Sequence, residues 1–196
     1  MKVAYQGTLG SYGHQASIKY FDDKVEPEGF TLSEQVVDAL VSREVDYAIL
    51  PVENSIIGNI DINMDLIYKN ELKAIAECYV PIKHCLLGKP GTKLEDIKVV
   101  YSHPAALGQC RDFLVEQNIK SSSYFDTAGA CRKVEKNNDG SVAAIASSFS
   151  ENFYDVSVIK EGIQKVEKNV TRFLILSVLE DFKRLEKGEE GKAMIA

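Results

Sequence analysis

The sequence predicts an α/β fold, and two observations favour this class. Short apolar runs typical of buried strands alternate with stretches whose apolar residues recur at helical spacing, from residue 3 to residue 178. No internal repeat, low-complexity tract or linker rich in Pro, Gly and Ser interrupts this alternation. The 196 residues, 45% of them hydrophobic, are enough for one compact domain or for two small lobes.

The first expected elements are a strand, a glycine turn and a helix. Residues 3–6 are typical of a buried strand, and Gly7 to Gly10 form a turn. Ser11 can cap the helix that follows, which we expect to end near Phe21. The next expected elements are an amphipathic helix over 32–41, a strand over 47–50, a helix over 61–68 and an extended stretch over 72–87 that Pro81 interrupts.

The alternation continues through the second half of the chain. We expect strands over 98–101, 122–125 and 142–146, helices over 104–117, 127–136 and 148–154, and a final strand over 171–178. If two lobes form without a linker, ordinary strands must join them, and we expect the crossings near 78–81 and 166–169. The expected division is lobe I over 1–78, lobe II over 79–166, a return segment over 167–185 that completes lobe I, and a tail over 186–196.

The composition excludes several classes of function. The formal net charge is −6, so nucleic acid, which requires a basic surface, is not an expected partner. No apolar run approaches the roughly 20 residues of a membrane helix, and no signal peptide is visible. We therefore expect a cytoplasmic protein with no membrane partner. The four cysteines lack CxxC spacing and the three histidines lack HxxxH spacing, so we expect buried thiols and no metal site.

Small hydroxyl residues stand where strands are expected to give way to helices. Ser11, Ser102 and Thr127 occupy three such junctions. Each can be an ordinary helix cap. Together they can line a cleft with O–H and N–H donors, which would hold a carboxylate dianion without many lysines.

Two further stretches place polar side chains at strand ends. Asn54 and Ser55 follow a buried strand, where they form either a turn or part of a site. Thr171 and Arg172 begin an otherwise apolar strand, and their alternation sends them to opposite faces. Thr171 can be simply a good strand residue, whereas Arg172 needs an anion from the protein or from a substrate.

The sequence carries no motif for a cofactor or for common nucleophilic chemistry. It has no GxGxxG or GxxxxGK[ST] loop, no HExxH, no paired DxE and no Ser-His-Asp order with a nucleophile elbow. We therefore expect no metal, flavin or nicotinamide cofactor.

Read together, seven segments resemble the prephenate dehydratase family. They occur in the family's order and cover about residues 1–180. The segments are 3–12 (VAYQG…GSY), 50–58 (LPVENS…G), 81–87 (PIKHCLL), 101–110 (YSHP…QC), 126–128 (DTA), 143–147 (AAIAS) and 169–173 (NVTRF).

The resemblance implies a two-lobe fold similar to periplasmic binding proteins, with the active site in the inter-lobe cleft. It implies a carbon–oxygen lyase of phenylalanine biosynthesis that converts prephenate to phenylpyruvate without a cofactor. It also leads us to expect a homo-oligomer, either a dimer or a tetramer. Thr171 matches the family's catalytic threonine, and the residues matched to substrate binding or the cleft are Asn54, Ser55, Gln109, Ser102, Thr127, Ser11 and Arg172.

The chain departs from the family pattern at three places. Ala105 stands where the family usually has glutamine, and Gly13 replaces a serine. Most members continue into an ACT regulatory domain, whereas residues 191–196 resemble only the start of one, so we expect a catalytic domain without most or all of it. The alternatives are an arogenate dehydratase, a prephenate decarboxylase that does not form the aromatic ring, and a non-enzymatic protein that binds a small anion on the same fold.

Overall fold

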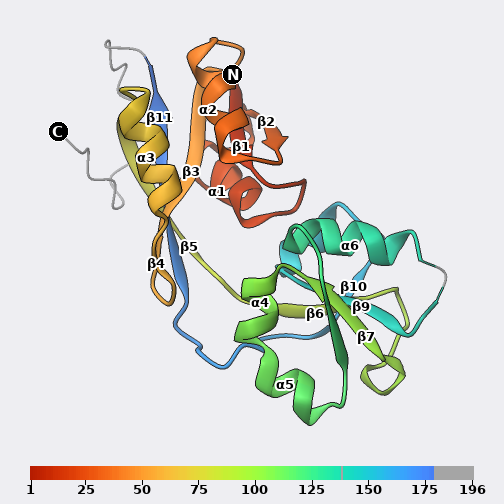
Figure 1. The fold of residues 1–196 in the computed structure, drawn as a ribbon. Helices are drawn as coiled ribbons and strands as arrows, with labels where there is room; N and C mark the ends of the chain where they lie inside the picture. Colours follow the sequence, from red (N-terminus) through yellow and green to blue (C-terminus); the bar gives the residue numbers. More distant parts are fainter. Residues whose placement is uncertain (138, 179–196) are drawn as a thin grey trace. The chain divides into compact units, whose positions relative to one another are not determined.

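The computed structural model describes residues 1–137 and 139–178 and confirms the α/β class (Figure 1). The chain forms two compact units. Of the described residues, the first comprises Met1–Gly7, Gly13–Pro81 and 170–178, and the second comprises Thr8–Tyr12 and Ile82–Asn169. The two crossings thus lie three residues beyond those of the expected division, and Thr8–Tyr12 joins the second unit. The expected tail over 186–196 lies outside the described residues.

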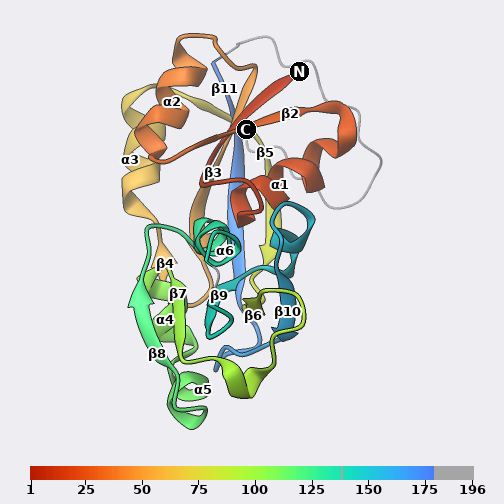
Figure 2. The ribbon, with the colours of Figure 1, turned by 90° about the vertical axis from the view of Figure 1, so that its right-hand side faces the viewer.

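The first unit contains a mixed sheet in the order β2-β1-β3-β11-β5, with β4 paired to β3. β1 runs parallel to β2 and β3, whereas β11 runs antiparallel to both of its neighbours, β3 and β5. Figure 2 shows β11, in blue, between β3 and β5. The strands are β1 (Lys2–Gln6), β2 (Glu26–Phe30), β3 (Tyr47–Asn54), β4 (Gly58–Asn59), β5 (Lys73–Pro81) and β11 (Val170–Ser177).

Helices α1 (Tyr12–Phe21), α2 (Ser33–Val41) and α3 (Asp61–Lys69) accompany this sheet, with a 3-10 turn over Asp22–Lys24. The apolar stripe of α2, which includes Val36 and Leu40, packs into a core with Leu50 of β3 and Leu176 of β11. Since β3 and β11 are interior strands, this packing fixes the position of their ends.

The second unit has its own mixed sheet in the order β10-β6-β9-β7-β8. Every residue of β9 is buried, as expected for an interior strand covered on both faces. Ile145 faces a core with Leu86 and Leu114, while Ala144 faces another with Cys131. The elements are β6 (Cys85–Gly88), β7 (Val99–Ser102), β8 (Lys120–Ser123), β9 (Val142–Ala146), β10 (Ser157–Lys160), α4 (Pro104–Gln109), α5 (Arg111–Glu116), α6 (Thr127–Glu135) and 3-10 turns over Leu94–Asp96 and Ser148–Asn152.

The elements differ from the sequence-based expectation in a few places. The helix expected over 104–117 is two helices, α4 and α5, which meet at Cys110. Gly108, a weak helix former, precedes this break. The helix expected over 148–154 is a 3-10 turn, and the expected strand over 122–125 lies two residues earlier, as β8. Strands β2, β4 and β10 were not expected. Among the described residues, no helix has the length and apolarity that a bilayer crossing requires.

Candidate active site

The end of β3 meets the start of β11 in a buried pair of polar side chains. Asn54 and Thr171 are direct partners in the antiparallel register, and both are buried. The Asn54 Nδ2 atom donates a hydrogen bond to the Thr171 Oγ1 atom at 2.9 Å. The Asn54 Oδ1 atom accepts from the backbone N–H groups of Ile56 (3.0 Å) and Ile57 (3.1 Å).

These contacts determine the direction of the hydrogen bond to Thr171. Backbone N–H groups only donate, so the Asn54 atom that faces Ile56 and Ile57 must be the oxygen. The amide nitrogen then faces Thr171 and must donate, so the threonine oxygen is the acceptor. Within the described part of the chain, no acceptor lies within hydrogen-bond distance of the Thr171 hydroxyl hydrogen. The hydroxyl is therefore held in place with its own proton available for a ligand.

Ser55 joins the end of β3 to the start of β11 through two hydrogen bonds. Its backbone N–H donates to the Val170 carbonyl oxygen at 2.9 Å, and its hydroxyl oxygen accepts from the Val170 N–H at 3.0 Å. The Asn54 amide nitrogen also lies 3.4 Å from the Val170 carbonyl oxygen. Ser55 thus stabilises the residue that precedes Thr171.

Arg172 lies on the other face of β11, as strand alternation predicts. Its Nε atom donates to the Glu77 carboxylate on β5 at 2.7 Å, and its Nη1 atom lies 3.6 Å from the Glu53 carboxylate on β3. Both anions come from the protein. The arginine thus joins β3 and β5, the two neighbours of β11, and of the two sources of an anion that the sequence left open, the protein supplies it.

Gln109 belongs to a polar network of the second unit. Its Oε1 atom accepts from the Asn169 Nδ2 atom at 2.9 Å and lies 2.9 Å from the His84 Nε2 atom. A carbonyl oxygen only accepts, so the His84 Nε2 atom carries the ring proton. The Gln109 Nε2 amide has no protein partner among the described residues, so its two N–H groups can bind a ligand.

His84 is buried, and its other contacts hold it in this network. Its backbone N–H donates to the Gln164 Oε1 atom at 2.9 Å. The Tyr12 hydroxyl donates to the Lys83 carbonyl oxygen at 2.7 Å and lies 3.3 Å from the His84 Nδ1 atom. Burial lowers the pKa of His84, although the hydrogen bond to Gln109 opposes this shift. The histidine is thus neutral at physiological pH, as its tautomer in the network requires.

The three hydroxyl residues at strand-to-helix junctions have different surroundings in the second unit. Ser102 is fully buried, and its hydroxyl donates to the Ile145 carbonyl oxygen at 2.6 Å, which joins β7 to β9. Thr127 begins α6, and its half-buried hydroxyl has no protein partner in the described part of the chain. Ser11 is buried, and its backbone N–H donates to the Thr8 carbonyl oxygen at 3.0 Å. Only the Thr127 hydroxyl is clearly available for binding.

The expected site residues therefore divide between the two units, and among the described residues a direct contact is found only in the first. In the first unit, Asn54, Ser55 and Thr171 are in contact, and Arg172 lies apart on the other face of β11. In the second unit, Gln109, Ser11, Ser102 and Thr127 occupy separate strand and helix ends. That all of them line one cleft stays a prediction.

The site includes residues that the sequence did not single out. His84 and Asn169 hold the Gln109 oxygen, yet neither was expected to take part. A signal was present in the sequence, since each is a polar residue beside apolar residues and such groups must find partners when buried. Among the described residues, no group of three or more His, Cys, Asp or Glu side chains could hold a metal ion.

Gly13, one of the departures from the family pattern, has a structural cause. A Cβ atom at this position would lie 2.6 Å from the Gln6 carbonyl oxygen. The first turn of α1 thus approaches β1 more closely than any side chain permits. At the other departure, the Ala105 N–H donates to the Nδ1 atom of His103, which caps α4.

Comparison with known proteins identifies the family. The prephenate dehydratase family model matches residues 3–180. The chain is 41% identical over 179 residues to arogenate dehydratase/prephenate dehydratase 1, chloroplastic, of Arabidopsis thaliana, with 90% of this chain and 45% of the relative aligned. The chain thus spans less than half the length of this curated relative.

Solved structures with the same fold agree with this assignment. A prephenate dehydratase from Arthrobacter aurescens in complex with L-Phe superposes with a TM-score of 0.82 at 26% identity, covering 90% of this chain and 60% of that chain. GqqA, described as a novel type of quorum-quenching acylase, gives a TM-score of 0.83 at 26% identity, covering 93% and 66%. The family match extends over nearly the whole described chain, and the chain therefore belongs to the prephenate dehydratase family.

Proposed function

We propose that this chain is the catalytic part of a prephenate dehydratase, a carbon–oxygen lyase that forms phenylpyruvate. One observation carries the proposal: Asn54 donates to the oxygen of the buried Thr171 hydroxyl and leaves its proton free for a substrate. The family match over residues 3–180 supports the same reaction.

The reaction needs a proton at the ring hydroxyl of prephenate. As the bond between the ring carbon and this hydroxyl breaks, the oxygen takes a proton that solvent supplies and leaves as water. The bond between the ring and its carboxylate breaks at the same time, and its electron pair enters the ring while carbon dioxide leaves. The gain of aromaticity drives both cleavages, so the protein needs mainly to assist departure of the hydroxyl.

Thr171 supplies this assistance as an oriented donor. A threonine hydroxyl is a weak acid, so it acts through a hydrogen bond that strengthens as negative charge develops on the departing oxygen. Assistance of this kind typically accelerates a reaction roughly 10²–10⁴-fold, or about 3–5 kcal/mol. Asn54 is a positioning residue, because it touches Thr171 and acts through it.

Neutral donors are the proposed carboxylate ligands. The free N–H groups of Gln109 and the hydroxyl of Thr127 at the start of α6 are suited to carboxylate oxygens. Arg172 contributes through the position of β11, since its guanidinium already contacts Glu77 and Glu53.

A parallel assay on prephenate and arogenate tests this function. Purified chain should release phenylpyruvate from prephenate, measured by the absorbance of the product, in buffer that contains a chelator. Faster release of phenylalanine from arogenate would favour the alternative contained in the name of the Arabidopsis relative. Saturable binding of prephenate without any aromatic product would exclude the dehydratase and favour a binding protein.

The remaining proposals concern the setting of the reaction. We propose that no cofactor is required, that the protein acts in the cytoplasm, and that it forms a dimer or a tetramer. The name of the Arabidopsis relative includes "chloroplastic", so its location differs from the one proposed here. Light scattering after size-exclusion chromatography would measure the oligomer, and a monomer would contradict that proposal.

A further inference from the structure

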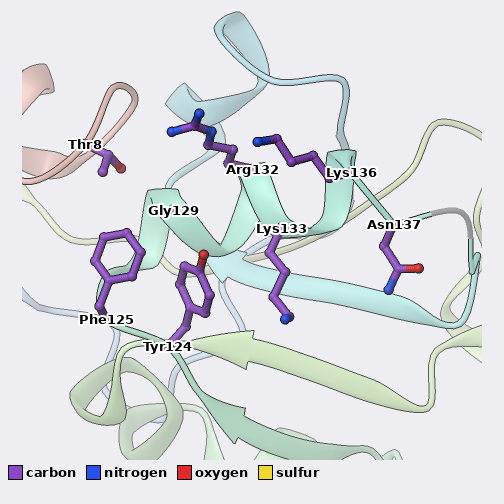
Figure 3. Close-up of a pocket in the computed structure, with 8 residues that line it drawn as sticks. All are labelled: Thr8, Tyr124, Phe125, Gly129, Arg132, Lys133, Lys136 and Asn137. Atoms are coloured by element: carbon purple, nitrogen blue, oxygen red, sulfur yellow. The ribbon is translucent and has the colours of Figure 1, made fainter.

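The second unit contains a pocket of about 470 Å³ that the proposed reaction does not use (Figure 3). Its volume lies in the range of pockets that hold small organic ligands. All of its lining residues belong to this one unit. They are Thr8, Tyr124, Phe125, Gly129, Arg132, Lys133, Lys136 and Asn137.

Three cations on α6 and its C-terminal cap supply the charge of this pocket. Arg132, Lys133 and Lys136 recur at helical spacing, although the whole chain carries a formal net charge of −6. In the described part of the chain, none of the three forms an ion pair with a carboxylate. Figure 3 shows the side chains of Arg132 and Lys136 on one side of α6, with Lys133 beside Tyr124.

The neighbouring carboxylates are engaged with other groups. The Asp126 carboxylate accepts from the Gly129 backbone N–H and, at 3.3 Å, from the Thr8 hydroxyl. The Glu135 carboxylate accepts from the Asp155 backbone N–H at 2.9 Å. Neither carboxylate forms an ion pair with Arg132, Lys133 or Lys136 among the described residues, so the three cations are not held by direct contact with an anion of the protein.

Two aromatic rings form the other wall of the pocket. Tyr124 and Phe125 lie with ring centroids 4.7 Å apart, and Phe125 is 56% exposed. Both rings approach α6 at Gly129, where a Cβ atom would lie 2.8 Å from Phe125 and 3.2 Å from Tyr124. The Lys133 Nζ atom lies 4.5 Å from the ring centroid of Tyr101 and 5.8 Å from that of Tyr124. A cation in the last turn of α6 also stabilises the helix end, but this does not account for an exposed ring beside a pocket.

We propose that this pocket binds a small molecule that combines a planar ring with a doubly negative phosphate group. The cations Arg132 and Lys136 bind the anionic group, and the exposed Phe125 ring stacks against the planar part. The proposed binding does not require the dehydratase reaction, because neither Thr171 nor Gln109 lines this pocket.

Calorimetric titration with three probes tests the proposal. Adenosine monophosphate has a ring and a phosphate, inorganic phosphate has only the charge, and adenosine has only the ring. We expect saturable binding of adenosine monophosphate, binding of phosphate at least about tenfold weaker, and no detectable binding of adenosine. The binding should weaken as salt rises, because the cations are near the surface. Absence of saturable binding by adenosine monophosphate at low salt would overturn the proposal, and equal affinity for phosphate would overturn the role of the ring.

A matched pair of double variants locates the binding. Arg132→Gln with Lys136→Gln should weaken adenosine monophosphate binding at least about tenfold, the equivalent of 1.4 kcal/mol. Arg111→Gln with Lys160→Gln removes the same charges from exposed positions outside the pocket and should leave the affinity unchanged. Equal losses in both variants would indicate a general charge effect and overturn the site. Loss of prephenate turnover in the first variant alone would make the pocket part of the substrate site and would also overturn the proposal.

Discussion

The Asn54 amide nitrogen donates to the Thr171 hydroxyl oxygen at 2.9 Å, where the last residue of β3 faces the second residue of β11. Because two backbone N–H groups hold the amide oxygen, the amide cannot reverse without losing both of these bonds. The hydrogen bond with Asn54 therefore does not use the Thr171 proton, which gives the first two predictions their direction.

Thr171→Val should remove the donor and keep the shape of the side chain. We expect kcat for prephenate to fall roughly 10²–10⁴-fold while the free energy of unfolding changes by about 1 kcal/mol. Thr171→Ser restores the hydroxyl with a freer rotation about χ1, so an intermediate loss is expected. Steady-state kinetics and thermal melts measure both effects. A folded valine variant with near-native kcat would remove Thr171 from the mechanism.

Asn54→Asp should reverse the direction of the hydrogen bond to Thr171 without changing the size of the side chain. The introduced carboxylate can still accept from Ile56 and Ile57, but it cannot donate to Thr171. The threonine must then donate its own proton to the carboxylate, so we expect a loss of kcat of roughly 10²–10⁴-fold at neutral pH. Activity should recover in part at low pH, where the introduced carboxyl regains a proton. A variant with unchanged kcat at neutral pH would refute this direction.

Arg172 should matter for stability and not for substrate affinity. Arg172→Lys cannot reproduce the planar guanidinium contact with Glu77, so we expect the free energy of unfolding to fall by about 1–2 kcal/mol. Glu77→Gln should have a similar effect, whereas Glu53→Gln should have less, because Glu53 lies farther away and is half exposed. Urea melts and KM for prephenate measure the two roles. A large rise in KM with unchanged stability would assign Arg172 to the substrate.

His84 should make the protein less stable in acid. Burial lowers its pKa in the folded protein, so the unfolded chain binds a proton more readily. The stabilising contribution is complete above the unfolded pKa of about 6.5 and decreases as pH falls below it, by at most about 1.4 kcal/mol per pH unit. His84→Gln should therefore lose less stability than the native protein between neutral and mildly acidic pH. An unchanged loss of stability in this variant between neutral and mildly acidic pH would show that His84 does not contribute to the pH dependence.

The four cysteines should be unreactive in the folded protein. All are buried, and burial raises the pKa values of Cys110 and Cys131 to about 12. At pH 8 only about 1 thiol in 10⁴ with such a pKa is a thiolate, the reactive form. Ellman's reagent should thus detect four thiols in denaturant and essentially none under native conditions. Rapid native reaction of one thiol would show that its part of the core opens readily.

The sequence predicted the interior strands better than the edges. β1 and β9 are apolar runs, because a strand that is buried on both faces requires apolar side chains. β2 contains Pro27 and Gly29, which weaken the strand pattern, yet it forms because an edge strand tolerates both. The family resemblance, made from motifs in register, is confirmed by the family match over residues 3–180.

The contacts within the site were harder to predict than its members. Asn54 and Thr171 were both expected, because polar residues at the ends of buried strands require partners. Their pairing depends on an antiparallel register between segments 117 residues apart, which no local pattern encodes. The role of His84 depends likewise on the approach of Gln109 from another element. The sequence shows which polar side chains are present, whereas the hydrogen-bond partner of each depends on how distant segments pack in the fold.

The place of β11 between β3 and β5 has a consequence for biosynthesis. A ribosome makes the chain from its N-terminus, so residues 82–169, nearly all of the second unit, emerge before this strand. The second unit can fold while the first sheet still lacks one of its interior strands, and such long-range pairing is slow to form. Thr171 is part of β11, so it is synthesised after residues 82–169. The hydroxyl that we propose to assist catalysis therefore takes its place only when β11 completes the first sheet.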